Sequence, residues 1–237
     1  MSTKLHGKRY NESAKHVPDH AVSFETAIIT LKKFKKAKFD ETVNICIWLG
    51  IDAKQADQAV RGSVSLPKGI GKSKRVIAFV QGNNIDTAKA AGAVEAGADD
   101  LIKKVNDGWT EFDVAIATPD LMPKIARLGK VLGPQGKMPS PKAGTVTTDV
   151  AGAVRDYTAG KIEFRNDAGG NVHALLGKVS FSDEDLAANA HAFIETIKKM
   201  KPTSSKGVFI KGITLTTTMS PAVHVDATKH NIEEETK

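Results

Sequence analysis

The amino-acid sequence predicts an α/β protein of two domains, one inserted into the other. The chain has 237 residues, which exceeds the usual size of one domain. Its middle third alternates short apolar runs with helical stretches, whereas the first and last thirds share amphipathic helices and half-polar strands. We therefore expect residues 1–69 and 161–237 to form a discontinuous α+β domain. Residues 70–160 would be an inserted α/β domain.

The first third begins with a polar arm and continues with one helix and two strands. Residues 1–20 show no steady period, and we expect this arm to be flexible. Apolar residues from Phe24 to Phe34 recur at helical spacing behind Ser23, a typical N-cap residue. The alternation from Val43 to Trp48 predicts a half-buried strand, and another strand is expected near residues 60–66.

The middle third predicts a parallel sheet. Arg75–Val80 and Asp113–Ala117 are short apolar runs. The first precedes an Ala-rich helical stretch that ends near Gly97, and the second precedes a helix from Pro119 to Arg127. A long irregular loop, Gly129–Thr148, and a helix near Asp149–Tyr157 complete this part.

The last third returns to half-polar strands. Lys161–Arg165 and Val172–Leu176 are predicted strands that flank a turn, and an amphipathic helix is predicted from Asp183 to Met200. Strands near residues 207–217 and 222–226 follow. The tail up to residue 237 is expected to be disordered.

The composition favours a soluble protein of a reducing compartment. Hydrophobic residues make up 41% and charged residues 26% of the chain. No run approaches the roughly 18 apolar residues of a membrane span, and the amino terminus lacks the apolar core of a signal peptide. The single cysteine, Cys46, excludes an internal disulfide and is expected to lie in the core. We expect a cytoplasmic protein with no membrane contact.

The positive charge is concentrated in one region. Residues 1–74 contain 14 Lys or Arg against 7 Asp or Glu, whereas residues 75–160 and 161–237 each contain 10 of both kinds. The net charge of +7 therefore arises from the first third. This asymmetry indicates either a polyanionic partner or simply a solubilising surface.

Enzymatic motifs are weak. The segment from Leu66 to Ser73 ends like a phosphate-binding loop, but it lacks the first glycine and precedes a predicted strand instead of a helix. A hinge loop between domains fits it better. The histidines are scattered, and the pair His16 and His20 flanks a proline, so no metal site is expected. No nucleophile–base pair is visible, and we predict no catalytic activity and no cofactor.

The segment Gly129–Thr145 has the composition of a functional loop. It contains several glycines and prolines together with Lys130, Lys137 and Lys142. Prolines stiffen such a loop, and glycines let its backbone approach another surface. It favours an interaction site over a plain surface loop. The alternative function is an α/β enzyme that binds a phosphorylated ligand there, which a thermal shift with small molecules would detect.

Several strings resemble one known family. AKFDETV, GIDAKQADQAVRGSVSLPKGIGK, LGPQGKMPSPKAGTV, KIEFRNDAGGNVHALLGK, KPTSSKG and TTTM resemble the family of bacterial large-subunit ribosomal protein number one. Their order and separation also match, from about Lys15 to Val225. The resemblance implies a double hinge between the two domains and a Rossmann-like fold for the insertion.

The resemblance also implies a function. The family is a structural constituent of the large ribosomal subunit that binds a stalk of large-subunit ribosomal RNA. It assists the release of deacylated tRNA from the exit site, and in bacteria it represses translation of its own operon by binding the messenger. Ribosomal RNA, exit-site tRNA and the operon messenger are therefore the expected partners. The free protein is expected to be a monomer.

Carried over residue by residue, the resemblance implies an RNA-binding set. Its members are short hydroxyls, cations and a few apolar or acidic side chains, as suits a shallow RNA minor groove. The set is Lys38, Phe39, Glu41, Thr42, Gly133, Gly136, Lys137, Lys142, Arg165, Asn166, Asp167, His173, Lys178, Thr216, Thr217, Thr218 and Met219. Core packing remains an alternative for Phe39. Glu41 and Asp167 are expected to orient cations or to accept hydrogen bonds from 2′-hydroxyls.

Two positions depart from the family pattern. Ser220 stands where the family usually has glycine, and it would be strained if that position required a positive φ. Gln135 stands where arginine is common, although Lys137 supplies a cation two residues later.

Overall fold

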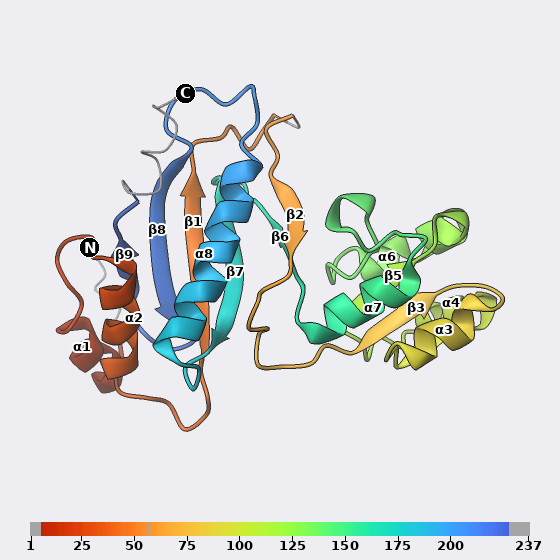
Figure 1. Ribbon diagram of the computed structural model, residues 1–237, viewed down its shortest axis with the longest axis horizontal. Coiled ribbons are helices and arrows are strands. Elements are labelled where there is room, and N and C mark those ends of the chain that lie inside the picture. The colour runs from red at the N-terminus through yellow and green to blue at the C-terminus, as the bar shows by residue number, and fades with distance from the viewer. Residues whose placement is uncertain (1–5, 56, 228–237) are drawn as a thin grey trace. The chain divides into compact units, whose positions relative to one another are not determined.

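The computed structural model describes residues 6–55 and 57–227. The chain divides into two compact units, which are drawn in Figure 1. The first unit contains the described residues of Met1–Val60, Leu66–Gly71 and Phe164–Lys237. The second contains Arg61–Ser65 and Lys72–Glu163. A mixed α/β fold is thus confirmed.

A four-stranded antiparallel sheet forms the centre of the first unit. Its order is β7-β1-β8-β9. The strands are β1 (Thr42–Leu49), β7 (Asn171–Lys178), β8 (Ile210–Thr217) and β9 (Val223–Val225). Burial alternates along β1, and Val43, Ile45 and Ile47 point into the core. The predicted half-buried strand is confirmed.

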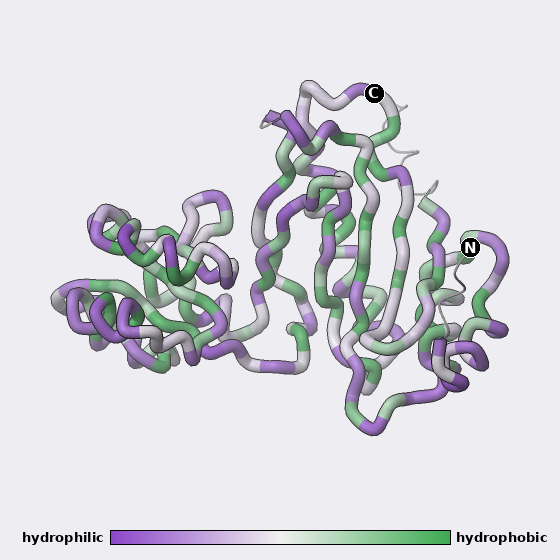
Figure 2. Tube along the Cα trace, turned by 180° about the vertical axis from the view of Figure 1, so that it is seen from behind, coloured by the Kyte–Doolittle hydropathy of each residue, from purple (hydrophilic) through white to green (hydrophobic). Residues whose placement is uncertain are grey.

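Two helices cover the same face of this sheet (Figure 1). They are α2 (Phe24–Lys33) and α8 (Asp183–Lys199). Both begin at a serine N-cap, because the hydroxyls of Ser23 and Ser182 accept hydrogen bonds from the first turn. Their apolar stripes supply core residues such as Ile28 and Phe193. The other face of the sheet is therefore left for polar side chains, and Figure 2 shows the hydropathy alternating along these strands.

The predicted flexible arm is wrong in part. Residues Lys8–Ala14 form helix α1, and Ser13 on this helix is buried. The helix is short, but packing against the rest of the unit supplies the stabilisation that an isolated peptide of this length lacks. The carboxy-terminal tail expected to be disordered lies beyond residue 227, outside the described residues.

The second unit contains a parallel three-stranded sheet with the order β4-β3-β5. Its strands are β3 (Val76–Phe79), β4 (Glu95–Gly97) and β5 (Val114–Ala117). All four residues of β3 and of β5 are buried, because alternate side chains enter two separate cores on opposite faces of the sheet. The predicted parallel sheet is confirmed.

Helices pack on this sheet. They are α3 (Asn84–Ala90), α4 (Asp99–Asn106), α5 (Met122–Ile125), α6 (Gly129–Leu132) and α7 (Val150–Ala159), with 3₁₀ turns Pro119–Leu121, Ala126–Leu128 and Pro141–Ala143. The Ala-rich helix predicted up to Gly97 was too long, since α3 ends at Ala90 and β4 follows. The prediction that Gly129–Thr148 is wholly irregular was also wrong, because α6 and a 3₁₀ turn lie within it.

A two-stranded sheet of β2 (Arg61–Val64) and β6 (Ile162–Arg165) lies where the chain passes between the units. The neighbouring segment from Leu66 to Ser73 does not form a phosphate-binding loop. It leads into strand β3 and does not itself open a helix, as a phosphate-binding loop must. Gly69 and Gly71 have positive φ there, which gives the segment its sharp turns.

Within residues 6–55 and 57–227, no helix is long and apolar enough to cross a bilayer. Nor do these residues contain a group of three or more His, Cys, Asp or Glu side chains placed to hold a metal ion.

Candidate nucleic-acid interface

The uncovered face of the first unit's sheet, which we call the open face, carries a row of polar side chains. Cys46 on β1 pairs with His173 on β7 and with Thr214 on β8, and Thr214 pairs in turn with His224 on β9. The Thr214 hydroxyl lies 3.2 Å from Nδ1 of His224. All four side chains are half-buried or exposed. The row can therefore offer hydrogen bonds across the width of the sheet.

Neighbouring rows of the open face also carry exposed or half-buried side chains. Asn44 pairs with Leu175 and Thr216, and Leu175 is 40% exposed. Trp48 pairs with Asn171 and is 49% exposed. Most of these residues were not predicted as site residues. The alternation of residue types along β1 assigns the side chains to two faces of the strand. It does not show which of these faces the helices cover, so the residues of the open face could not be identified from it.

Cys46 corrects a prediction. The thiol was expected in the core, but it is half-buried on the open face. Burial and the nearby Asp167 carboxylate both raise the pKa of the Cys46 thiol, which stays protonated at neutral pH.

A hollow of about 340 Å³ lies in the first unit where β1 begins and β8 ends. Phe39 and Met219 line it, and they are 54% and 51% exposed. Core packing is therefore excluded for Phe39. The hollow also borders Ser13 and the lysine-rich end of α2, so it combines apolar surface with positive charge.

The buried Glu41 side chain holds the backbone segments that form this hollow. Its carboxylate is buried and accepts hydrogen bonds from the Thr217 hydroxyl, from the Met219 amide at 3.0 Å and from the Ala37 amide at 2.9 Å. Burial raises the pKa of Glu41, but these hydrogen bonds outweigh it and hold the pKa below its ordinary value. Glu41 and Thr217 thus hold the backbone that presents Met219, and neither side chain is free to orient a cation.

The turn after Thr217 shows why Ser220 is tolerated. No non-glycine residue in the described chain has a positive φ, so Ser220 is not strained as it would be at such a φ. Its hydroxyl accepts a hydrogen bond from the Thr217 amide at 3.0 Å and donates one to the Pro221 carbonyl at 3.0 Å. The serine side chain closes the turn through its own hydrogen bonds.

Asp167 organises the turn between β6 and β7. Its Oδ1 accepts hydrogen bonds from the amides of Gly169 and Asn171, each at 2.8 Å, and its Oδ2 lies 3.5 Å from Nε2 of His173. The amide and side chain of Asn171 are the main reasons why the pKa of Asp167 is lowered to about 2. Asp167 therefore holds His173 and the turn in place, beside the exposed Arg165.

The remaining predicted residues of the first unit occupy two places. Asn166 is bonded within the unit, where its side-chain oxygen accepts from the Val60 amide at 2.9 Å. Lys178 donates to the Thr42 hydroxyl at 2.9 Å, and Thr218 accepts from the Thr42 amide at 3.1 Å. Lys178, Thr42 and Thr218 therefore lie together at the end of the sheet where β1 begins.

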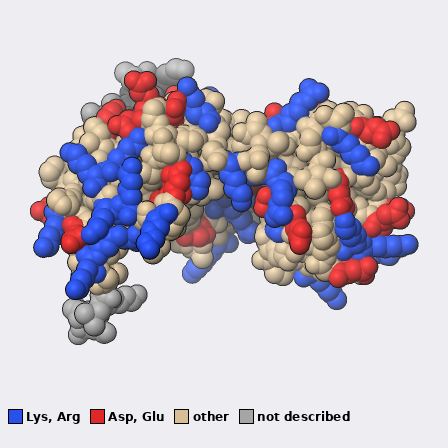
Figure 3. All heavy atoms as spheres, turned by 90° about the horizontal axis from the view of Figure 1, so that it is seen from below, with Lys and Arg blue, Asp and Glu red and all other residues tan. Residues whose placement is uncertain are grey.

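The end of α2 adds a cluster of cations. Lys32 pairs with Asp183 and Lys35 with Glu12, whereas Lys33, Lys36 and Lys38 are exposed. Figure 3 shows Lys and Arg side chains gathered over this end of the first unit. Five of the cations of residues 1–74 therefore lie close together in the chain at the end of α2, from Lys32 to Lys38.

The predicted residues of the second unit lie in a folded loop. Gly136 has a φ of 68°, which favours glycine, and a Cβ on Gly133 would lie 2.4 Å from the Gly129 carbonyl oxygen. Lys137 donates to the Thr110 carbonyl at 2.9 Å and lies 5.1 Å from the centre of the Phe112 ring. Lys137 therefore fastens the loop, while Lys142 is exposed and available to a phosphate.

This arrangement indicates a nucleic-acid-binding protein. A broad polar face with exposed aromatic, apolar and cationic side chains suits an extended polyanion better than a small substrate. The family model described as "Ribosomal protein L1p/L10e family" matches residues 31–221 of the chain.

Three curated relatives are named "Large ribosomal subunit protein uL1". The relative from Maridesulfovibrio salexigens is 48% identical over 93% of this chain and 94% of its own length. The relative from Kosmotoga olearia is 49% identical over 94% of this chain and 96% of its own length. The relative from Cutibacterium acnes is 50% identical over 92% of this chain and 95% of its own length. The chain belongs to the Ribosomal protein L1p/L10e family. It is a family of structural proteins, so the chain is not an enzyme, and the alternative of an enzyme with a phosphorylated ligand is discarded.

Proposed function

We propose that the chain is a structural constituent of the large ribosomal subunit in the cytoplasm and binds the stalk of large-subunit ribosomal RNA. The observation that supports this most directly is the open face together with the hollow at its end. There Phe39 and Met219 are exposed beside a lysine cluster, on backbone that the buried Glu41 holds in place. Exposed apolar side chains next to cations suit the shallow minor groove and phosphates of RNA.

In our proposal, the protein has two further partners, its operon messenger and the exit-site tRNA. A messenger structure that imitates the stalk would compete for the stalk-binding surface, and the protein would thereby repress its own operon. Bound to the stalk, the protein would assist the release of deacylated tRNA from the exit site. The exposed Lys142 and the loop Gly133–Lys142 of the second unit would add a smaller contact. We propose that the free protein is a monomer.

We propose further that the two compact units are two domains, the first made from both chain ends and the second inserted. The composition of the units supports this, because Leu66–Gly71 and the chain from Phe164 onward belong with the amino-terminal part. The boundaries inferred from sequence, 69/70 and 160/161, lie two to three residues from the crossings at 71/72 and 163/164, but Arg61–Ser65, expected in the first domain, belongs to the second unit.

The single cysteine offers a direct test of the open face. Cys46 lies in the middle of β1, between His173 and Thr214. Saturating amounts of the ribosomal RNA stalk fragment should slow alkylation of Cys46 by iodoacetamide several-fold at pH 8.5, where part of the thiol is ionised. An RNA hairpin of equal length and unrelated sequence serves as the control. An unchanged rate at saturating stalk RNA would place the binding surface elsewhere.

Salt dependence tests the contribution of phosphate contacts. Roughly four to six contacts predict a log–log slope of affinity against salt near −3 to −5, since each phosphate contributes about −0.7 to −0.9. Filter binding at several salt concentrations measures it. An affinity that barely changes between low and moderate salt would contradict a phosphate-dominated interface.

A further inference from the structure

Trp48 lies on the open face at the far end of β1 from the hollow. It is 49% exposed, although its neighbours Ile47 and Leu49 are buried. The strand holds a large aromatic ring at the surface, where about half of its apolar area stays exposed to solvent. A rise of about 3.3 Å per residue puts Trp48 about 20 Å from Thr42. It is therefore far from the implied residues at the hollow, whereas Asp167 of the implied set is bonded to Asn171, the strand partner of Trp48.

The surroundings of Trp48 leave its ring accessible and add a positive charge. Gly212 and Asn171 are its partners on the adjacent strands. A Cβ on Gly212 would lie 4.0 Å from the indole, which is an ordinary van der Waals distance, so the ring lies close to the Gly212 backbone. The Lys211 ammonium lies 5.1 Å from the centre of the ring, and Lys211 is exposed.

The loop between α8 and β8 is fixed against this end of the sheet. The Gly50 amide donates to the Phe209 carbonyl at 2.7 Å, and the Ser205 hydroxyl donates to the Gly50 carbonyl at 2.9 Å. Any side chain at Gly50 would collide with the Val208 carbonyl, because a Cβ there would lie 2.2 Å from its oxygen.

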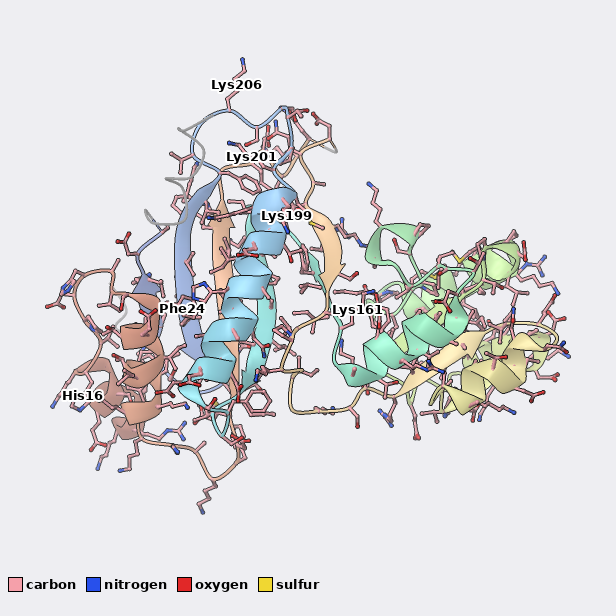
Figure 4. The ribbon with its side chains drawn as sticks, in the orientation of Figure 1. His16, Phe24, Lys161, Lys199, Lys201 and Lys206 are labelled. Atoms are coloured by element: carbon pink, nitrogen blue, oxygen red, sulfur yellow. The ribbon has the colours of Figure 1, made fainter. Side chains whose placement is uncertain are left out.

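The fixed loop gathers further cations at the same end of the first unit. Figure 4 shows Lys206 projecting from the loop, with Lys201 and Lys199 near the end of α8. Lys211 is the cation beside the exposed ring, and the other lysines add positive charge to this end of the unit.

We propose that Trp48 is a stacking platform for an unpaired nucleobase of the bound RNA, and that Lys211 holds a phosphate next to that base. The inference rests on the proposed function. Aromatic rings beside cations on a sheet are the usual means of holding single-stranded nucleic acid, because every base has a π-face and every nucleotide a phosphate. A protein partner would favour a wider apolar patch than this ring, whose neighbours are Asn171, Gly212 and Lys211.

The distance between the hollow and Trp48 sets a requirement on the structure of the bound RNA. A stem bound near the hollow has to supply an unpaired base about 20 Å away along β1. A bulge, an internal loop or a strand end would meet that requirement, whereas a continuous duplex would not.

Intrinsic fluorescence tests the stacking. The chain has two tryptophans, and Trp109→Phe leaves Trp48 as the sole reporter. Titration of this variant with the stalk fragment should quench the emission, with the same midpoint as filter binding. Heparin, a polyanion without bases, should bind the lysines but quench much less. Equal quenching by heparin would overturn the proposal.

Substitutions give an independent readout in the unmodified background. Trp48→Ala should weaken binding of the stalk fragment by about tenfold, and Trp48→Phe by much less, since a phenyl ring still stacks. Trp48→Leu keeps apolar area without a π-face and should behave like Trp48→Ala. A Trp48→Leu variant that binds as well as Trp48→Phe would instead support a plain apolar contact, such as a protein partner makes.

Different experimental results would overturn the stacking proposal and the RNA-binding function on which it rests. If the unsubstituted chain binds the stalk fragment while Trp48 emission and the affinity of Trp48→Ala are unchanged, stacking is overturned and RNA binding stands. If the unsubstituted chain does not bind the fragment at all, the proposed function itself is overturned.

Discussion

Residues at the hollow divide into those that hold the backbone and those that face outward. Thr217 is 7% exposed and donates its hydroxyl to Glu41, whereas Met219, two residues later, is 51% exposed. Two neighbours within one implied RNA-binding string therefore have different physical roles. Substitution can separate them.

Thr217→Val should lower stability, and Met219→Ala should lower RNA affinity. The valine removes a donor from a buried carboxylate, which costs about 1–3 kcal/mol of unfolding free energy. The alanine removes exposed apolar surface and should leave the melting temperature nearly unchanged. Thermal unfolding and filter binding measure the two effects. Thr216→Val, on the same strand but half-exposed, is the control for stability. A large loss of stability in Met219→Ala would place Met219 in the core.

Asp167 predicts a pH dependence of stability. Its pKa is lowered from 3.8 to about 2 in the folded chain, mainly by the Asn171 amide and side chain. The carboxylate therefore stabilises the folded state fully above about pH 4, and this contribution disappears as the pH falls toward 2. Urea unfolding between pH 2 and 5 should show this loss in the wild type but not in Asp167→Asn. Parallel pH profiles for the two proteins would argue against the carboxylate holding the turn.

Among the secondary-structure elements, helix α8 is joined to the segment Leu66–Gly71 by a buried asparagine. The Asn189 side chain accepts from the Lys68 amide at 3.0 Å and donates to the carbonyls of Gly69 at 2.9 Å and Leu176 at 2.7 Å. Asn189 is 0% exposed. One side chain thus ties a helix, a strand and a connecting segment of the first unit together.

Asn189→Ala should destabilise the protein by about 2 kcal/mol or more, because it leaves buried backbone groups without partners. Glu195→Ala, at an exposed position of the same helix, should change stability by no more than about 0.5 kcal/mol. Chemical denaturation measures both. Equal stabilities for the two variants would show that water replaces the amide.

Across the molecule as a whole, positive charge is distributed unequally. The basic excess lies in residues 1–74, most of which belong to the first unit. Lys74 donates to the Lys161 carbonyl at 2.7 Å, so the two chain crossings lie close together. Removal of the intervening residues therefore leaves a short gap.

A chain without residues 75–160, with Lys74 joined to Lys161 by a short Gly/Ser linker, should fold and keep most of its affinity for the stalk RNA. It should lose only the contribution of the loop Gly133–Lys142. Circular dichroism and filter binding measure the two results. An unfolded product would refute the discontinuous domain, and a folded product that does not bind RNA would move the main site into the insertion.

Elements with a local signal could be predicted from the sequence alone. They include the helices α2 and α8 with their serine caps, the alternating strand β1 and the buried runs β3 and β5, because periodicity and capping act over a few residues. The short helix α1 and strand β4 were missed, since segments of this length owe their structure to the surrounding chain. Family membership also followed from the sequence, because several long strings matched in order.

Which side chains face outward depends on tertiary packing and could not be predicted. Glu41 and Thr217 are separated by 176 positions, and their hydrogen bond exists only because β1 and β8 lie side by side. Cys46 and Trp48 became surface residues because α2 and α8 cover the opposite face of the sheet. A period of two separates the faces of a strand, but the helices that bury one of them come from elsewhere in the chain.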